Sequence, residues 1–534
     1  MFSLAIFIGI YSYLIFILGT LGLIEKKNIL LLTLFVLFLS IIYFLKSKPK
    51  KSIHLNNLFK DKLAFFLLLL LLLQVAINLI GVLGPELGFD ALWYHLTLPR
   101  VYLLNHSVVH IPGGLLYYSD MPKLIEMLYT ASLAFGNEIL AKLVHFSFGI
   151  LSCIALYFLS RKFFNAKFSI LAVLIFYSNL VVGWESITAY VDLARTFFEV
   201  MALWGFINFL EDKDKKWLVE SAVMVGLAVS TKLLALGSIG IFLCLIIYFG
   251  LSSHKKITKV FTDALIFTFL SLLIPLPWFV FSFVHTGNPF YPLLTGTYPV
   301  SFSFTLLNLF NFLKEVWNLL IRSADPISPI YLIFLPLILI YFRKFSKIIK
   351  FIGLYCLFAI LAWYFTPRTG GGRFLLPYLP AFSILCVQII KIFEKKEEYR
   401  RLFIVLVIFI SLSSITYRGI ANAKFIPVIL GKESKSHFLS SHLNFSFGDF
   451  YDTDGYFEKN ITSKDTVILY GFHNLYYINF PFLDSSWVKK GNMFNYIATQ
   501  NSNLPKRFSN WNLIYYNPKT YVSLYSLGGM KWAY

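Results

Sequence analysis

The sequence predicts an all-α polytopic membrane protein with about 13 transmembrane helices, amphipathic helices in two outside loops and a small C-terminal α/β domain. Of the 534 residues, 58% are hydrophobic and only 14% are charged, whereas a soluble protein carries about 25% charged residues. The mean hydropathy is +0.70. The apolar residues also form long runs such as 63–83, and about 20 apolar residues cross the hydrocarbon core of a bilayer.

The long apolar segments of the chain predict its membrane spans. The first has no charged n-region and no cleavage signature, so it is interpreted as a retained helix rather than a signal peptide. The stretch 218–250 is too long for one span and is interpreted as a hairpin of short helices with Lys232 at its outer turn. The predicted spans are 2–24, 28–45, 63–83, 139–159, 168–184, 190–210, 218–231, 233–250, 262–284, 329–342, 347–365, 374–392 and 400–418.

Basic residues set the predicted orientation. Six short loops hold most of the loop Lys and Arg, and the longer loops between them hold few. The positive-inside rule places the basic set in the cytoplasm, so the N-terminus is expected inside and the C-terminus outside a cytoplasmic (inner) membrane. This pattern explains the net charge of +20 without nucleic-acid binding. The basic loops are 46–62, 160–167, 211–217, 252–260, 343–350 and 391–401.

The same orientation places nearly all the non-membrane mass outside. Residues 1–418 form the predicted transmembrane domain, with large outside loops at 84–138 and 285–328. The tail, 419–534, is polar and contains short β-like runs at 466–470 and 512–516. A separate extracytoplasmic α/β domain is therefore expected at the C-terminus.

The first outside loop begins with a group of candidate site residues. Glu86 and Asp90 follow directly on an apolar span. The pattern of 91–104 predicts an amphipathic surface helix with Asp90 near its N-cap. Two roles stay open for Asp90: it caps this helix, or it accepts a proton from a hydroxyl nucleophile. Further candidates in this segment are Tyr94, His95 and Arg100.

Charged residues also lie within predicted helices. Glu126 has apolar neighbours, which is costly unless the carboxylate is paired or faces a cavity, and both roles remain open. Asp192, Arg195 and Glu199 are spaced to share one helix face. Each such charge costs about 2.5–3.5 kcal/mol in the hydrocarbon. The stripe is therefore expected to face the bundle interior, either as an ion-pair brace or as part of a site.

Basic residues on the outer side need an explanation because that side is poor in them. Lys232 lies at the turn within 218–250, and Arg368 and Arg373 bracket three glycines. Guanidinium groups and a glycine-rich backbone suit a phosphate group; the alternative is a flexible loop whose arginines touch lipid headgroups. His285 opens a turn rich in Pro and Gly at the outer interface.

Six short motifs occur in a fixed order between residues 63 and 392: GFDALWYHLTLPR, MPKLIEMLY, AYVDLA, STKL, TGNPFYP and GGRFLLPYLP. Together they resemble the fold-type C glycosyltransferases, the group related to protein O-mannosyltransferases and lipid A aminoarabinose transferases. The resemblance implies a polyprenyl-phosphate-linked sugar donor, an extracytoplasmic site and a lipid, glycan or protein acceptor. It also implies inverting transfer of a hexose or pentose.

The resemblance assigns roles to particular residues. An acidic residue of the first outside loop would be the catalytic base, which maps onto Asp90, and Lys232 and Arg373, with Arg368, would hold the carrier phosphate. Ala91 follows Asp90, so the chain lacks the adjacent Asp-Glu pair of the protein mannosyltransferases, and mannose and protein acceptors are in doubt. No metal ligand set is predicted, and a divalent metal stays possible. Secondary acidic candidates are Glu86, Asp192 and Glu126, and other site candidates are Tyr94, His95, Arg100, Arg195 and His285.

Other functions remain as alternatives. An oligosaccharide ligase or another membrane transferase would share the span pattern. A secondary transporter would also contain broken helices and embedded charges, but it predicts pseudo-symmetric halves, and the sequence contains no internal repeat signature. A structural or receptor-like membrane protein has no evident use for the charges at Asp192, Arg195 and Glu199. The absence of Walker A, HExxH, GxSxG and paired CxxC motifs removes the usual sequence support for ATP-driven transport and zinc peptidase activity.

Overall fold

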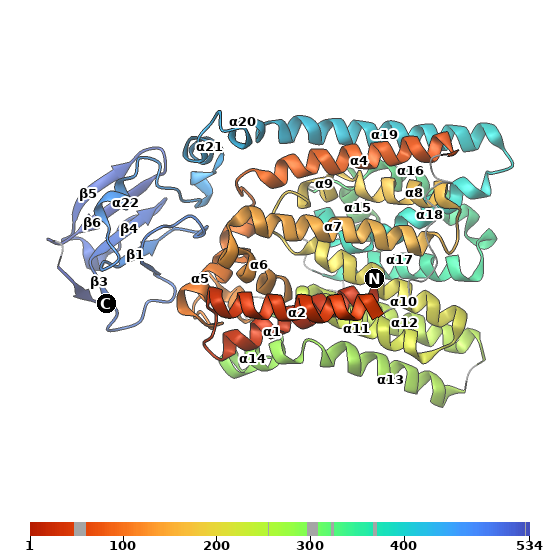
Figure 1. Cartoon of the computed structure of the whole chain (residues 1–534), viewed down its shortest axis with the longest axis horizontal. Coiled ribbons are helices and arrows are strands. Elements are labelled where there is room, and N and C mark those ends of the chain that lie inside the picture. Colours follow the sequence, from red (N-terminus) through yellow and green to blue (C-terminus); the bar gives the residue numbers. More distant parts are fainter. Residues whose placement is uncertain (47–59, 255, 296–307, 322–324, 367–370, 529) are drawn as a thin grey trace.

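Helices run side by side through most of the chain, and a small group of strands lies beyond one end of them (Figure 1). The computed structural model describes residues 1–46, 60–254, 256–295, 308–321, 325–366, 371–528 and 530–534. The main helices are α1 (Phe2–Thr20), α2 (Lys26–Lys46), α4 (Lys62–Leu83), α7 (Glu138–Ser160), α8 (Ala166–Tyr177), α9 (Leu180–Glu185), α10 (Asp192–Asp212), α11 (Lys215–Thr231), α12 (Leu236–Ser252), α13 (Ile257–Leu273), α14 (Leu276–Thr286), α16 (Pro329–Tyr341), α17 (Lys347–Phe365), α18 (Leu379–Ile392) and α19 (Glu397–Ala423).

The helical membrane fold is confirmed, and the number of spans stays a prediction. Among the described residues, eight helices are long and apolar enough to cross a membrane, or nine if α13 and α14, which meet at a bend of 59°, form one span. A helix lies at each of the predicted segments, but several are short. The segment 168–184, expected as one span, is divided into α8 and α9. The orientation of the termini also stays a prediction.

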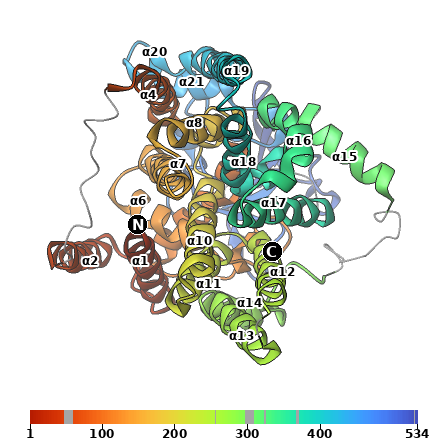
Figure 2. The ribbon, with the colours of Figure 1, turned by 90° about the vertical axis from the view of Figure 1, so that its right-hand side faces the viewer.

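Helix α10 lies near the middle of the bundle, between α7 and α11 (Figure 2). Of the residues in its most apolar 18-residue stretch, 94% are buried. The stripe of Asp192, Arg195 and Glu199 is buried with it. The expectation that these charges face the bundle interior is therefore confirmed.

The stretch 218–250 is interrupted at Lys232, as predicted. Helix α11 ends at Thr231, Lys232 has an extended backbone with φ −153° and ψ 122°, and a 3₁₀ turn, η3 (Leu233–Ala235), leads into α12. Helices α11 and α12 both pack along α13. The chain therefore turns back at Lys232 and presents this lysine at a helix end.

The first outside loop differs from the single helix expected over 91–104. A π-helical turn, η1 (Ala91–His95), is followed by a separate helix, α5 (Thr97–Asn105). Pro99 lacks the N–H that would bond to the carbonyl of His95. Regular α-helical bonding is therefore interrupted between His95 and Thr97. Further short helices in the two loops are η2 (Tyr117–Asp120), α6 (Leu124–Phe135) and α15 (Leu309–Ile321).

The tail contains the expected mixed sheet. Strand β1 (Val467–Tyr470) runs parallel to both β2 (Phe482–Asp484) and β4 (Tyr496–Gln500), in the order β2–β1–β4–β6–β5. Strand β6 (Val522–Ser526) is antiparallel to β4 and to β5 (Asn512–Asn517). The predicted strands at 466–470 and 512–516 are confirmed. Shorter elements are α20 (Ile426–Ile429), α21 (Lys435–His442), α22 (Tyr456–Asn460), β3 (Met493–Phe494) and β7 (Trp532–Ala533).

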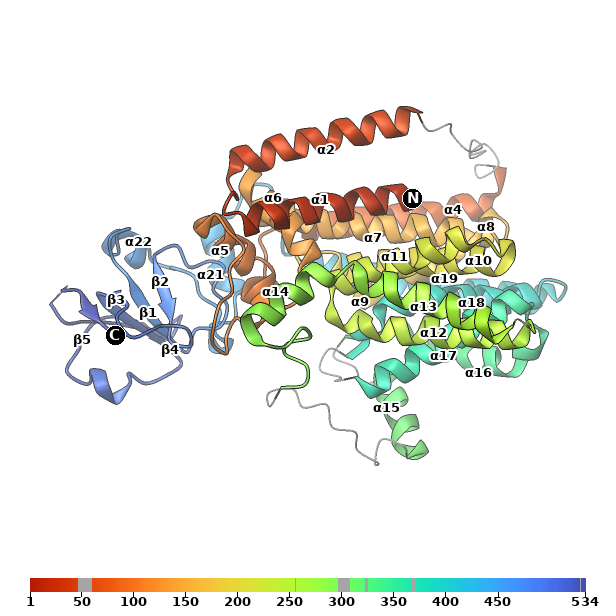
Figure 3. The same ribbon diagram turned by 90° about the horizontal axis from the view of Figure 1, so that it is seen from below.

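The tail lies beside the end of the bundle that carries α5 and α21 (Figure 3). Helix α19 runs without a break to Ala423 before the tail begins. The division into domains at 418 and 419 remains an expectation.

Candidate active site

A cavity of about 450 Å³ lies where the first loop, the α11–α12 turn and the segment after α17 meet. Its lining combines aromatic rings with charged side chains, which is the composition typical of a small-molecule site. The lining residues are Asp90, Trp93, Tyr94, His95, Tyr117, Tyr118, Met121, Pro122, Lys123, Glu126, Val191, Thr231, Lys232, Leu233, Leu234, Pro292, Leu293, Arg373 and Phe374.

Two carboxylates and two cations alternate in a chain of ion pairs at this cavity, which Asp90, Arg373 and Lys232 line. The Arg373 Nη2 atom lies 2.7 Å from Asp90 Oδ2, and Arg373 Nε lies 3.1 Å from Asp192 Oδ2. The other oxygen of Asp192, Oδ1, accepts a bond of 2.7 Å from Lys232 Nζ. The structure thus joins Asp90, Arg373, Asp192 and Lys232, which the sequence names separately, into one network.

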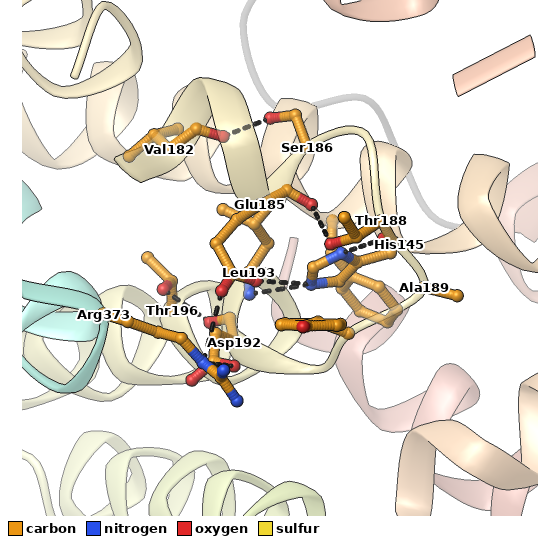
Figure 4. A network of polar contacts seen from close by, with 12 residues as sticks. His145, Val182, Glu185, Ser186, Thr188, Ala189, Asp192, Leu193, Thr196 and Arg373 are labelled. Carbon is orange, nitrogen blue, oxygen red and sulfur yellow. Dashed lines mark hydrogen bonds and ion pairs between the residues drawn. The ribbon is translucent and has the colours of Figure 1, made fainter. Parts of the chain in front are cut away.

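Glu185 also belongs to this network, although the sequence argument did not single it out. Its Oε1 atom lies 3.3 Å from Arg373 Nε, and the side chain is fully buried. Figure 4 shows Arg373 directed toward Asp192, with Glu185 and His145 on neighbouring elements. His145 donates from Nδ1 to Thr188 O at 2.8 Å and accepts the Leu193 N–H at Nε2, 3.1 Å away. His145 therefore holds the start of α10, from which Asp192 projects.

Tyr190 contacts both members of the Asp90–Arg373 pair. The backbone N–H of Asp90 donates to the Tyr190 hydroxyl at 3.0 Å. The Arg373 guanidinium lies 4.5 Å from the centre of the Tyr190 ring, a distance that gives a cation–π attraction. Tyr190 is a second residue that the sequence argument missed, and it fixes the carboxylate and the guanidinium relative to each other.

The charge of Arg373 favours the ionised form of the Asp90 carboxylate. Burial opposes its ionisation, but the positive charge of Arg373 outweighs the burial and holds the pKa of Asp90 below its usual range. The Tyr94 hydroxyl donates to Asp90 Oδ2 at 3.3 Å. Asp90 occupies the N-cap position of η1, but in the described part of the chain its side chain makes no capping hydrogen bond. The capping role considered for Asp90 is therefore wrong, because Arg373 and Tyr94 engage its carboxylate.

A buried hydrogen-bonded pair, His95 and Glu126, also lines the cavity. His95 Nδ1 lies 2.7 Å from Glu126 Oε1, and both side chains are buried. Lys123 lines the same cavity, and its Nζ donates to Met121 O at 2.9 Å. Burial lowers the pKa of Lys123 to about 8 against the opposing charges of Glu126 and Asp120. The sequence signal for Lys123 was its place in a long loop that contains few basic residues.

Other predicted residues lie elsewhere among the described residues. The Glu86 carboxylate accepts the N–H groups of Gly88 at 2.6 Å and Ala189 at 2.7 Å. Arg195 lies 3.6 Å from Glu199 and donates to the Tyr378 hydroxyl at 2.8 Å. Arg100 donates to the carbonyl of Tyr476, and the ring of His285 stacks on that of His110 with 5.1 Å between centres. Arg368 lies outside the described residues.

The polar residues around the cavity suit anion binding and proton transfer. Within the described ranges, no group of three or more His, Cys, Asp or Glu side chains is placed to hold a metal ion. Two cations border a space that also contains an ionised carboxylate. Such an arrangement can hold a phosphate group and receive a proton from a hydroxyl.

Comparison with known proteins identifies the fold. A family model described as dolichyl-phosphate-mannose-protein mannosyltransferase matches residues 124–280, which include Asp192 and Lys232. No curated protein matches the sequence. The crystal structure of ArnT from Cupriavidus metallidurans bound to undecaprenyl phosphate has a TM-score of 0.56 and 11% identity, covering 86% of this chain and 98% of that one. The apo ArnT structure gives a TM-score of 0.57 and 11% identity over 87% of this chain and 98% of that one.

A more distant similarity involves the archaeal oligosaccharyltransferase AglB from Archaeoglobus fulgidus, with a TM-score of 0.48, 14% identity and coverage of 80% of this chain and 69% of that one. The likeness to ArnT extends over nearly the whole of both chains. The resemblance to fold-type C glycosyltransferases inferred from the six motifs is confirmed.

Proposed function

We propose that this chain, which has the fold of the fold-type C glycosyltransferases, transfers one sugar from a polyprenyl-phosphate donor to a hydroxyl acceptor at the extracytoplasmic face of the membrane. One observation carries the proposal: Asp90, Arg373 and Lys232 line a single cavity. The ArnT structure of this fold was solved with undecaprenyl phosphate bound, which supports a carrier of that class.

The proposed reaction divides the site into a base and a phosphate seat. The acceptor oxygen attacks the anomeric carbon from the side opposite the phosphate, which inverts that carbon. The bond between the anomeric carbon and the phosphate oxygen breaks, and the carrier phosphate leaves with the electron pair. The hydroxyl proton passes to the carboxylate of Asp90. Arg373 and Lys232 stabilise the negative charge that develops on the leaving phosphate.

The Asp90–Arg373 ion pair gives the donor a second role, which is to change the basicity of Asp90. A phosphate seated between Arg373 and Lys232 competes with Asp90 for the Arg373 Nη2 atom, which lies 2.7 Å from Asp90 in this structure. When the guanidinium turns toward phosphate, Asp90 loses its nearest opposite charge. Its pKa then rises toward the ordinary range for a carboxyl group. Donor binding would therefore make Asp90 a stronger base at the moment when the reaction needs one.

Asp192 and Glu185 keep Arg373 in place during this exchange. Both carboxylates face the Nε side of the guanidinium, whereas Asp90 faces Nη2. When the Asp90 contact is lost, Asp192 and Glu185 therefore still hold Arg373 through its Nε atom. Lys123 lines the same cavity and supplies a third cation. Glu126 and His95 form a separate hydrogen-bonded pair and are not the proposed base.

Loss and restoration of the gene in its source cell tests the proposal. We expect mass spectrometry of surface glycans and lipids to show a species that loses one hexose or pentose residue on deletion. The wild-type gene restores it and the Asp90→Asn gene does not. Loss of a whole preassembled chain would instead identify an oligosaccharide ligase. Unchanged glycans together with altered uptake of a labelled solute would identify a transporter.

A further inference from the structure

We infer that a short segment of the C-terminal domain, residues 473–477, positions the loop that carries Asp90 and is needed for the transfer step. This inference rests on the proposed function, because it assigns a task in the same reaction. The segment follows β1 directly. We name it the clamp segment.

Two hydrogen bonds join the clamp segment to the backbone on either side of Asp90. The Tyr477 hydroxyl donates to Glu86 O at 3.0 Å. The Tyr476 backbone N–H donates to Leu92 O at 3.2 Å. Since these carbonyls lie four residues before and two residues after Asp90, the clamp segment fixes both ends of the short stretch that presents the carboxylate.

Ring contacts hold the same stretch from the side. The imidazole of His473 stacks on the ring of Phe89, with 4.7 Å between centres and 27° between planes. The same imidazole lies 4.3 Å from the ring of Trp93, which lines the cavity. The residue before Asp90 and a residue of the cavity wall therefore share one partner in the C-terminal domain.

The opposite side of the clamp segment is tied to the helical domain. Arg100 of α5 donates to the carbonyl of Tyr476. The Tyr476 hydroxyl donates to Glu138 Oε2 at 3.3 Å, and Lys435 of α21 pairs with the other oxygen of Glu138. Arg100, predicted as a site residue, thus acts here as a partner of the clamp segment.

The clamp segment is itself held within the C-terminal domain. The backbone N–H groups of His473 and Asn474 both donate to Gly448 O, at 3.2 and 3.0 Å. The Asn474 side chain donates to Asp449 at 2.5 Å, and Asn474 is buried. A segment anchored in this way can transmit the position of the sheet to the Asp90 loop. Small displacements of a catalytic group reduce rates strongly, so loss of the clamp should slow transfer.

Tyr477→Phe in the full-length protein tests the inference. It keeps the ring and removes the hydroxyl that bonds to Glu86 O. We expect kcat to fall about five- to tenfold with KM for the donor changed less than about twofold. The acidic limb of the kcat/KM profile should shift, because the Asp90–Arg373 distance in the free protein is no longer fixed. Hydrogen exchange of residues 86–95 should rise. The control is Tyr516→Phe in β5, an exposed tyrosine, which should leave all three unchanged.

His473→Ala, which removes the stacked ring, provides a second variant and should give the same pattern. The inference is overturned if both variants fold, keep wild-type kcat and pH profile, and leave hydrogen exchange at 86–95 unchanged. It is also overturned if kcat falls only in proportion to the loss of folded protein. If wild-type protein transfers no sugar but Tyr477→Phe raises exchange at 86–95, the proposed function fails while the structural clamp stands.

Discussion

The guanidinium of Arg373 lies 2.7 Å from the carboxylate of Asp90, although the two residues are 283 positions apart in the chain. The contact joins the loop 84–138 to the segment between α17 and α18. It places the proposed base and the proposed phosphate ligand in direct competition.

The pH dependence of transfer should differ between free and donor-bound protein. Arg373 holds the pKa of Asp90 below its usual range in the free protein, so Asp90 becomes protonated only as the pH falls through that lowered value. Donor binding removes the contact and raises the pKa. The acidic limb of kcat should therefore lie at higher pH than that of kcat/KM, since the two report the donor-bound and free forms. Coincident limbs would show that Arg373 does not exchange partners.

Arg373→Lys should weaken use of the donor. Lysine keeps the positive charge but loses the planar fork that reaches Asp90 and Asp192 at the same time. We expect KM for the donor to rise about tenfold or more, corresponding to a lost charge-assisted bond. Arg418→Lys is the matched control, because Arg418 is buried in α19 and bonds to Asn422 at 2.7 Å. Equal effects of the two changes would assign the loss to general destabilisation.

Deprotonation of Lys123 should lower kcat/KM at alkaline pH. Its pKa is lowered to about 8 by burial, so the ammonium is charged below that pH and loses its charge as the pH rises through it. If this cation helps to hold the donor, kcat/KM should fall above pH 8 in the wild type. In Lys123→Arg the charge persists, and the fall should disappear. If kcat/KM falls at the same pH in the wild type and in Lys123→Arg, Lys123 does not help to hold the donor.

Two substitutions of Tyr190 can distinguish the effect of its hydroxyl on Asp90 from the effect of its ring on Arg373. Tyr190→Phe removes the hydroxyl that accepts the Asp90 N–H and keeps the ring under Arg373. We expect kcat to fall about three- to tenfold with KM for the donor nearly unchanged. Tyr190→Leu also removes the ring, so KM should rise as well. Steady-state kinetics on both variants checks this, and a KM effect in Tyr190→Phe would contradict the assignment of the hydroxyl to Asp90 alone.

The sequence identifies Asp90, Lys232 and Arg373 because each departs from its local pattern. Asp90 follows an apolar span, Lys232 interrupts one, and Arg373 is basic on the side where basic residues are few. These departures have a physical cost, and that cost makes each residue a candidate for a functional role. The sheet of the tail is equally readable from its short β-branched and aromatic runs, such as 467–470.

Glu185 and Tyr190 could not be found in the same way. Glu185 is the last residue of α9, and Tyr190 lies in the segment before α10. No single helical period relates either residue to Asp192, so their spacing to Asp192 says nothing about which side chains meet. The single helix expected over 91–104 was wrong because the backbone changes from a π-helical turn to a separate α-helix at Leu96, and the apolar pattern does not reveal this change. Hydropathy alone also does not reveal the breaks at α8–α9 and α13–α14.

The most direct measurement is transfer by purified Asp90→Asn, with the donor and acceptor defined by the glycan mass difference described above. Asparagine keeps the shape of the side chain and cannot serve as the base. The account predicts a loss of turnover of about 100-fold or more. The folded variant should bind undecaprenyl phosphate at least as tightly as the wild type, since Arg373 is released. Near-wild-type turnover by folded Asp90→Asn would contradict the account.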